Sequence, residues 1–493
     1  MPDAVVVSRA RRARARAVVV LVGALLAAVA PAPADRATPA PPGPPAAASS
    51  TGTGTGAGAV GGVGTGVGAS STTHARIDLY QQAVAVLPDG ARAEVPVAAV
   101  ATYLPGTRVP DPAVAVLTAA LGGTPTTTVP LGPRAARAAA AEQRAWLAAG
   151  TVPGDDGRYA GLARAALLDL HALTVDGVVV AGWSPHWRYV WPRDASFVAV
   201  ALARTGRVAD ALALLDFLAA VQEPDGSFEA RYRPDGSGPP DDRGTQSDGT
   251  GWSMWAAGLV LAEVPAAERP AVAARLAPLV SRSATHALTL VAEGLPPASP
   301  DYWEVAEHEV TLGTAAPLVA GLEQAAAVLS AADRPDDAAR ARAGAARARD
   351  AVVAAFGPGG YGRYPSRPVP DAASAFVLAP FWAQPPADGA AAWRASVPSM
   401  LRPAAGLAPG GAWRRDGVSW TPQTSLYAWV AAEQGDVATA TRWLDVIDAH
   451  RTASGSIPEK LLADGAPAAV APLAWSAACV LLALDALDAL DES

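Results

Sequence analysis

Two glutamates occur in loops rich in aromatic residues, where a carboxyl group can act as an acid or as a base. Glu304 follows Asp-Tyr-Trp at residues 301–303, and Glu459 follows Ile-Pro at residues 457–458. Aromatic neighbours keep water away from a carboxyl group, and cleavage of a glycosidic bond needs one carboxylic acid and one carboxylate. A loop glutamate is often just a helix cap or a surface charge, so these residues alone do not establish a catalytic role.

Other long loops carry the groups that bind sugars. Residues 183–194 contain three tryptophans, one tyrosine and the pair Arg193-Asp194. Tryptophan and tyrosine rings stack on the C–H faces of a sugar, while Asp, Arg and Gln side chains bond its hydroxyls. The mixture predicts a saccharide pocket; the alternative is that the 14 tryptophans cap helix ends and fill the core. The other loops of this kind are residues 222–249, 294–309, 410–416 and 455–460.

The elements that must position these loops are helices. From residue 134 to the end, apolar residues recur at spacings of three and four. Short links alternate with the long loops, which favours antiparallel helix pairs whose long loops meet at one end. This rhythm predicts an all-α (α/α)6 barrel, and the alternative, an α-solenoid, lacks the fixed sequence period it would show. The predicted helices are 134–149, 159–173, 195–204, 208–221, 251–262, 267–293, 310–329, 335–356, 372–380, 393–401, 421–434, 437–450 and 472–490.

The N-terminal region predicts export. Residues 1–34 have the arginine-rich start, the apolar stretch and the Ala-Pro-Ala end of a signal peptide. Residues 35–73 form a Pro/Gly/Thr-rich sequence that predicts a disordered linker. Residues 74–133 predict a short segment of strands or an extended arm, and residues 134–493 the helical domain. The protein is therefore expected to be secreted, and an uncleaved signal would hold it at the cell envelope, its one membrane contact.

Composition and single residues narrow the classes of function. The net charge of −8 argues against a nucleic-acid partner. The sequence has no glycine-rich loop followed by a lysine, the pattern that would predict a phosphate-binding site. The lone cysteine, Cys479, lies in an apolar helical run and is expected to be buried. His308 has no partner at metal-ligand spacing and is interpreted as a helix-terminal residue. No cofactor is expected, with a structural calcium ion in a loop left open. Lys460, the only lysine, is interpreted as a surface charge that could tune Glu459.

Several motifs follow one another in a set order along residues 159–490. The motifs are Trp-Arg-Tyr-Val-Trp-Pro-Arg-Asp-Ala-Ser-Phe-Val at 187–198, Leu-Leu-Asp-Phe-Leu at 214–218, Asp-Gly-Ser-Phe at 225–228, Gln-Ser-Asp-Gly-Thr-Gly-Trp at 246–252, Tyr-Trp-Glu at 302–304, Gly-Ser-Ile-Pro-Glu at 455–459 and Pro-Leu-Ala-Trp-Ser at 472–476. In this order they resemble glycoside hydrolase family 15, the glucoamylases and their bacterial relatives, which include glucodextranases and trehalases.

The resemblance implies an exo-acting, inverting glycoside hydrolase that releases terminal glucose from α-glucans or α-gluco-oligosaccharides. Glu304 resembles the general acid of the family, and Glu459 resembles the general base that activates water. In that geometry the two carboxyl groups stand roughly 6.5–9.5 Å apart, which leaves room for the water. Arg193 and Asp194 resemble the pair that bonds the outer hydroxyls of the terminal sugar.

Further sugar contacts are expected from aromatic and basic residues in the same motifs and loops. The expected walls of the pocket are Trp191, Trp252 and Trp303. Arg414 is the candidate for a further sugar-binding arginine, in competition with Arg415.

The chain departs from the family at the residue after the general acid. Many relatives have a second acidic residue there, whereas this chain has Val305, and Glu307 is a candidate substitute. The expected partner is an oligosaccharide or polysaccharide. The alternative functions are a trehalose-cleaving or phosphorolytic enzyme on the same barrel, and a catalytically idle saccharide-binding protein of the envelope.

Overall fold

The computed structural model describes residues 74–113, 132–155 and 157–491. All of these residues belong to one of the two units into which the chain divides, residues 70–493. The predicted signal peptide and linker lie outside the described residues. The α-helices are α1 (Pro133–Ala148), α2 (Ala160–Leu173), α3 (Pro192–Arg204), α4 (Val208–Val221), α5 (Ser247–Glu263), α6 (Arg269–Leu290), α7 (Leu312–Ala331), α8 (Pro335–Phe356), α9 (Gly389–Met400), α10 (Thr421–Glu433), α11 (Val437–Ala449) and α12 (Ala474–Asp491), and the 3-10 helices are η1 (Gly357–Gly359) and η2 (Ala372–Val377).

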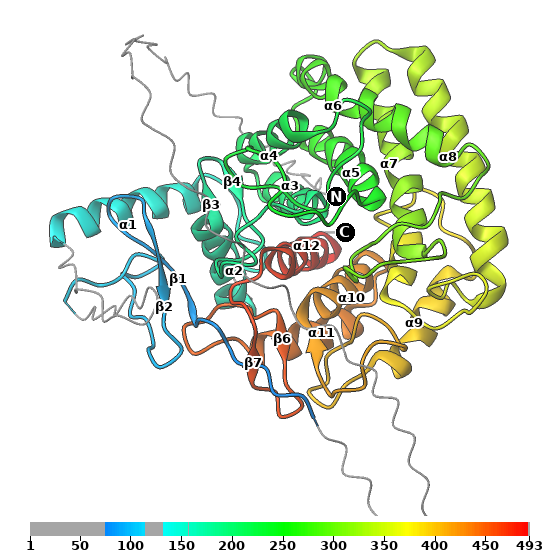
Figure 1. Cartoon of the computed structure of the whole chain (residues 1–493). Helices are drawn as coiled ribbons and strands as arrows, with labels where there is room; N and C mark the ends of the chain where they lie inside the picture. The colour runs from blue at the N-terminus through cyan, green and yellow to red at the C-terminus, as the bar shows by residue number, and fades with distance from the viewer. Residues whose placement is uncertain (1–73, 114–131, 156, 492–493) are drawn as a thin grey trace, which may run out of the picture. The chain divides into compact units, whose positions relative to one another are not determined.

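From α2 onward, these elements alternate between an outer and an inner ring (Figure 1). In the inner ring α3 packs on α5 and α12, α5 packs on α7, and α10 packs on α12, with η2 between α7 and α10. The outer helices α2, α4, α6, α8, α9 and α11 each pack on an inner neighbour. Six outer and six inner elements make an (α/α)6 barrel, which confirms the predicted fold class.

The burial of each helix follows from its place in the barrel. The inner helices α3 and α10 each bury 12 of their 13 residues, because other helices surround them. The outer helix α8 buries seven of 22, spaced mainly three and four residues apart along one face. Helix α7 is long and apolar enough to cross a membrane by composition, but it is an inner helix of the barrel and is mostly buried.

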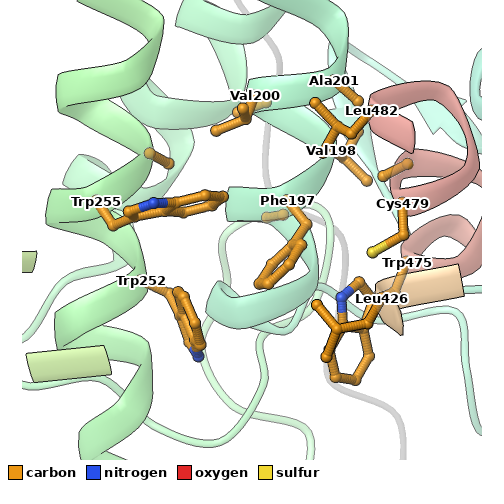
Figure 2. Packing of buried hydrophobic residues seen from close by; sticks show 14 of the residues in the cluster. Phe197, Val198, Val200, Ala201, Trp252, Trp255, Leu426, Trp475, Cys479 and Leu482 are labelled. Atoms are coloured by element: carbon orange, nitrogen blue, oxygen red, sulfur yellow. The ribbon is translucent and has the colours of Figure 1, made fainter. Parts of the chain in front are cut away.

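An aromatic cluster fills the centre of the inner ring. Phe197 of α3 lies between Trp252 and Trp255 of α5 and Trp475 of α12 (Figure 2). Its ring centroid is 5.0 Å from that of Trp252, 5.1 Å from that of Trp255 and 5.5 Å from that of Trp475. Cys479 is buried in the same core, as predicted. The cluster gives the inner helices a fixed spacing close to their N-terminal ends.

One predicted inner helix is wrong. Residues 372–380 were expected to form an α-helix, whereas η2 is a six-residue 3-10 helix that ends at Val377. Prolines at positions 370 and 380 bracket this segment, and a residue before a proline is disfavoured in the α conformation. The side chain of Asp371 caps the short helix by accepting a hydrogen bond from the N–H of Ala373 at 2.9 Å.

The N-terminal segment is an extended arm that continues into a hairpin. Strands β1 (Ala83–Val86) and β2 (Arg92–Val95) pair in antiparallel fashion. Before them, Leu79 forms a parallel bridge with Ala469. Strands or an extended arm were predicted for this segment, and its described residues contain a hairpin preceded by an arm. The remaining strands are β3 (Thr174–Val175), β4 (Val178–Val179), β5 (Ser419–Trp420), β6 (Lys460–Leu461) and β7 (Pro467–Ala468), which pair as β3–β4 and as β5–β6–β7.

Candidate active site

The first turns of three inner helices open on one cavity of about 100 Å³. Arg193 and Asp194 come from α3, Pro422 and Gln423 from α10, and Trp475 from α12. A helix start leaves backbone N–H groups free and suits polar side chains, so this end of the barrel favours a binding site. We call this cavity the inner lobe.

A second cavity of about 250 Å³, which we call the outer lobe, shares part of this lining. The residues common to both lobes are Trp187, Trp191, Tyr302, Glu304, Trp420 and Glu459. The outer lobe adds His186, Arg231, Arg243, Trp303, Pro409, Trp413 and Lys460. Both glutamates singled out in the sequence therefore lie on the boundary between the two lobes, although 155 residues separate them in the chain.

A turn that begins at the buried Asp301 positions Glu304. The carbonyl oxygen of Asp301 accepts from the N–H of Glu304 at 2.8 Å, and its carboxylate accepts from the N–H of Trp303 at 2.9 Å. The Thr311 hydroxyl and the Arg363 guanidinium donate to the same carboxylate at 2.7 and 2.9 Å. Glu304 has a φ of +55°, in the left-handed region that residues other than glycine rarely adopt. Such backbone strain persists only where the surroundings enforce it, so the loop fixes this glutamate.

Two arginines hold the carboxylate of Glu304. Nη2 of Arg193 lies 2.9 Å from Oε1, and Nη1 of Arg243 lies 3.0 Å from Oε2. The side chain of Arg193 is buried in α3, whereas that of Arg243, from the long loop before α5, is 42% exposed. Each carboxylate oxygen thus accepts from one guanidinium, one of them enclosed and the other open to solvent.

Glu459 lies in a more enclosed place, just before β6. Its N–H donates to the carbonyl of Val470 at 2.8 Å, and its carbonyl accepts from the N–H of Thr421 at 3.0 Å. Burial raises the pKa of the Glu459 carboxyl group, and the Lys460 ammonium opposes this rise. Nζ of Lys460 is 3.4 Å from Oε2 of Glu459. A general base must be shielded and still ionised, and a cation beside a buried carboxylate meets both needs.

Buried charges surround Arg193 at the end of the inner lobe. Its Nη1 lies 2.9 Å from the carboxylate of Asp248, and its Nε lies 3.6 Å from that of Asp194. Burial raises the pKa of Asp194 to about 7 and that of Asp248 to about 6, with Arg193 opposing both shifts. One guanidinium therefore organises the polar groups of α3, α5 and the Glu304 loop.

Tryptophans form the walls of both lobes. Trp303 packs edge-on against Trp413 with ring centroids 4.8 Å apart, and Trp413 packs against Trp420 at 5.6 Å. This row connects the Glu304 loop with β5, which pairs with β6 next to Glu459. Trp191, predicted as a wall, borders both lobes, and Trp303 borders the outer lobe.

Two predicted sugar contacts lie elsewhere. Trp252 is fully buried in the aromatic core and does not line either lobe (Figure 2). Trp252 lies in the second turn of α5, at a helix position from which its ring packs against Phe197 and Phe376. Arg414 is exposed and outside the lining of both lobes, with its guanidinium carbon 5.8 Å from the ring centroid of Trp413.

Two charged residues differ from their predicted roles. Lys460 is not a surface charge: its side chain is only 15% exposed, and its ammonium lies 4.2 Å from the ring centroid of Trp420. Glu307, the proposed substitute at Val305, is occupied elsewhere. Its carboxylate accepts from Arg363 at 2.6 Å and from the Tyr364 hydroxyl at 2.8 Å, and it lines neither lobe.

Sequence reasoning missed several residues of the site. Gln423 is buried in the inner lobe, and its Oε1 has no hydrogen-bond partner among the described residues. Arg231 and Arg243 come from a long loop without periodicity, so no local pattern marks them as cavity residues. Trp187 and Trp475 stand inside quoted motifs, and their position there was the available signal.

Comparison with known proteins gives structural likeness alone. No protein-family model matches the chain, and no curated protein matches it by sequence. A glycosidase variant in complex with glucose matches with a TM-score of 0.57 and 23% identity, over 67% of this chain and 96% of that chain. A bacterial glucoamylase complexed with acarbose matches with a TM-score of 0.55 and 17% identity, over 70% of this chain and 58% of that one.

A third solved structure is the glucoamylase from Saccharomycopsis fibuligera. It matches with a TM-score of 0.53 and 14% identity, over 71% of this chain and 94% of that chain. The chain has a glucoamylase-like (α/α)6 barrel. At these identities the likeness extends to the fold alone.

Proposed function

We propose that this protein is an exo-acting, inverting glycoside hydrolase that releases terminal glucose from α-glucans or α-gluco-oligosaccharides. The observation that carries the proposal is the placement of Glu304 and Glu459 on the boundary of the two lobes. A glycosidic bond positioned at that boundary has one sugar in each lobe. Hydrolysis then needs the two carboxyl groups on either side of the bond.

The resemblance of their motifs to those of the glucoamylases supports different roles for the two carboxyl groups. Glu304 protonates the glycosidic oxygen as general acid, and the bond from that oxygen to the anomeric carbon breaks. Glu459 takes a proton from a water molecule, whose oxygen attacks the anomeric carbon from the opposite face. Water enters on the face opposite the departing group, so the configuration at the anomeric carbon inverts.

The inner lobe suits the terminal sugar. Trp191 and Trp475 offer apolar faces, while Arg193, Asp194 and Gln423 offer charged and polar groups around them. Nε of Arg193 and Oε1 of Gln423 have no hydrogen-bond partner among the described residues. Sugar hydroxyls both donate and accept, so a bound ring would satisfy both atoms.

The test is glucose release by the purified chain from maltooligosaccharides, isomaltooligosaccharides, dextran and trehalose, with and without inorganic phosphate. The Glu304→Gln and Glu459→Gln variants serve as matched controls that keep side-chain shape. We expect free glucose, formed first as the β-anomer in a rapid NMR time course. Both variants should lose this release.

Each alternative function gives a distinct result in the same assay. A phosphorolytic enzyme would form a sugar phosphate only when phosphate is present. A trehalose-cleaving enzyme would leave the glucans intact. An idle saccharide-binding protein would release nothing and would bind the sugars equally well as the wild type and as the Glu304→Gln variant.

A further inference from the structure

The outer lobe contains more basic side chains than the inner lobe. Arg231, Arg243 and Lys460 all line it. Lys460 pairs with Glu459. Apart from the contact of Arg243 with Glu304, Arg231 and Arg243 share one carboxylate, that of Asp241. Nε of Arg243 lies 3.3 Å from that carboxylate, and Arg231 contacts the same oxygen.

Arg231 is a fixed part of this surface. Its side chain is only 6% exposed, and Nη1 donates to the carbonyl of His186 at 2.8 Å. The guanidinium carbon lies 4.5 Å from the ring centroid of Tyr189 and 5.0 Å from that of Trp191. Its Nε has no hydrogen-bond partner among the described residues. A rigid, enclosed guanidinium with an unused donor is a site for an anion.

Arg243 also contacts Glu304, the proposed general acid. Oε2 of Glu304 accepts from Arg243, and Oε1 accepts from Arg193. A general acid must direct an O–H toward the leaving oxygen. The N–H of Arg243 occupies one acceptor site of Oε2, so an O–H on that oxygen has to use its other site. Release of Arg243 therefore frees Oε2 to direct its O–H toward the leaving oxygen.

We propose that the outer lobe binds a leaving group that carries an anion, a carboxylate or a phosphate, and that this anion draws Arg243 away from Glu304. The inference rests on the hydrolase activity proposed above. The anion pairs with the guanidinium groups of Arg243 and Arg231, which both line the outer lobe. Glu304 then gives its proton to the leaving oxygen as the glycosidic bond breaks, and the attacking water loses its proton to Glu459. With a neutral leaving group, Asp241 is the only other carboxylate that pairs with Arg243 among the described residues.

The experiment compares two α-glucosides that differ in one charge. The probes are 4-carboxyphenyl and 4-carbamoylphenyl α-D-glucopyranoside, whose substituents have similar size, and a 4-phosphonophenyl glucoside separates preference for phosphate from preference for carboxylate. The value of kcat/KM is measured for each probe with the wild type, Arg243→Ala and Arg243→Gln. Arg275→Ala is the matched control, since Arg275 is 46% exposed and pairs with Asp216 on the outer ring.

We expect the wild type to favour the anionic glucosides by about tenfold, the worth of one charge-assisted hydrogen bond. Both Arg243 variants should lose this preference, because kcat/KM changes in opposite directions on the anionic and the neutral probes. Their kcat/KM falls on the anionic probes and rises on the neutral probe, because Arg243 no longer occupies Oε2 of Glu304. Arg275→Ala should keep the preference of the wild type.

Three other results have separate meanings. Equal kcat/KM of the wild type on charged and neutral probes would overturn the anion site while leaving the hydrolase intact. A parallel loss on all probes in both Arg243 variants would overturn it too, because that pattern indicates damage to Glu304 itself. No hydrolysis of any glucoside, together with no glucose release from the glucans, would instead reject the proposed function.

Discussion

The Glu304 loop and the Glu459 loop meet at one cavity but are built in opposite ways. Glu304 is part of a strained turn, and arginines from two different parts of the chain contact its two oxygens. Glu459 is enclosed, and a single cation, the neighbouring Lys460, lies beside one of its oxygens. The first group depends on contacts over long sequence distances, while the second depends on its own neighbour and on backbone pairing.

The difference suggests how two identical side chains acquire two roles. Arg243 can leave Glu304, since it is exposed and has Asp241 as another partner. The environment of Glu304 is therefore adjustable, as suits a group that gives up and regains a proton. Lys460 cannot move far from Glu459 because it adjoins it in the chain and is buried against Trp420. A constant cation suits a group that must begin each turnover ionised.

The largest expected effect concerns the roles themselves. On maltooligosaccharides, Glu304→Gln and Glu459→Gln should each lower kcat by about a hundred- to ten-thousandfold, the usual contribution of an acid or base. On α-glucosyl fluoride the two variants should separate, because fluoride leaves without a proton. Glu304→Gln should then retain activity within about tenfold of the wild type, while Glu459→Gln should stay inactive. The measurement is fluoride release followed with an ion-selective electrode.

A reversed order of these two variants on the fluoride would exchange the roles of the carboxyl groups. If neither variant hydrolysed the fluoride, the division into acid and base would be contradicted, because fluoride leaves without help from a general acid. The fold of each variant is checked by its thermal unfolding, which the isosteric glutamine should leave nearly unchanged.

The second prediction tests the support behind the Glu304 loop. Arg363 is buried between Asp301, Asp371 and Glu307, and its guanidinium carbon lies 3.7 Å from the ring centroid of Trp303. Arg363→Met leaves buried carboxylates without their cation and should lower the free energy of unfolding by about 3–5 kcal/mol. Urea denaturation measures this loss.

A partly exposed ion pair gives the matched control. Arg349→Met breaks a pair with Glu323 in which the side chains are 22% and 12% exposed, so the loss should be smaller than that in Arg363→Met. Equal losses in the Arg349 and Arg363 variants would mean that the three carboxylates do not depend on Arg363.

The third prediction uses the buried carboxyl group of Asp194. Its pKa is raised from 3.8 to about 7 in the folded protein, so the folded state holds a proton that the unfolded state has lost at intermediate pH. Stability from this group is therefore complete below about pH 4 and declines as pH rises to about 7. Asp194→Asn should remove this decline, so its free energy of unfolding should fall less than that of the wild type between pH 4.5 and 7.5.

Urea denaturation at the two pH values gives the comparison, with the exposed Asp336→Asn variant on α8 as control. If the free energy of unfolding of Asp194→Asn fell as much as that of the wild type between these pH values, Asp194 would already be ionised throughout this range. The neighbouring Arg193 would then outweigh burial at this position.

Helix periodicity predicted most of the barrel, and the misplacement of Trp252 follows from where a helix begins. Helix α5 was expected from residue 251, which placed Trp252 at the edge of a loop, whereas α5 begins at Ser247. Four extra residues put Trp252 one turn inside the helix and into the core. Trp303, also next to a motif glutamate, remains in a loop and lines the outer lobe. A few residues in a helix start thus decide between core and cavity.

The order of the motifs predicted that the loops of Glu304 and Glu459 belong to one site, and the structure places both glutamates on one cavity. The contacts that adjust them could not be predicted, because they join residues far apart in sequence. Arg243 reaches Glu304 across 61 positions, and Arg363 reaches Asp301 across 62. Neither arginine belongs to a periodic pattern, since a loop side chain is directed by tertiary packing and not by its neighbours in sequence.

The smallest expected effect concerns Lys460 and the pH dependence of catalysis. A general base acts only when ionised, so kcat/KM rises with pH as Glu459 loses its proton. Burial raises the pKa of Glu459 and the Lys460 cation opposes that rise, so Lys460→Met should shift the acid limb of the pH profile to higher pH. A neutral substrate is used, because Lys460 also lines the outer lobe. Arg275→Met should leave the limb in place, and an unmoved limb in Lys460→Met would mean that Glu459 is held ionised without its neighbour.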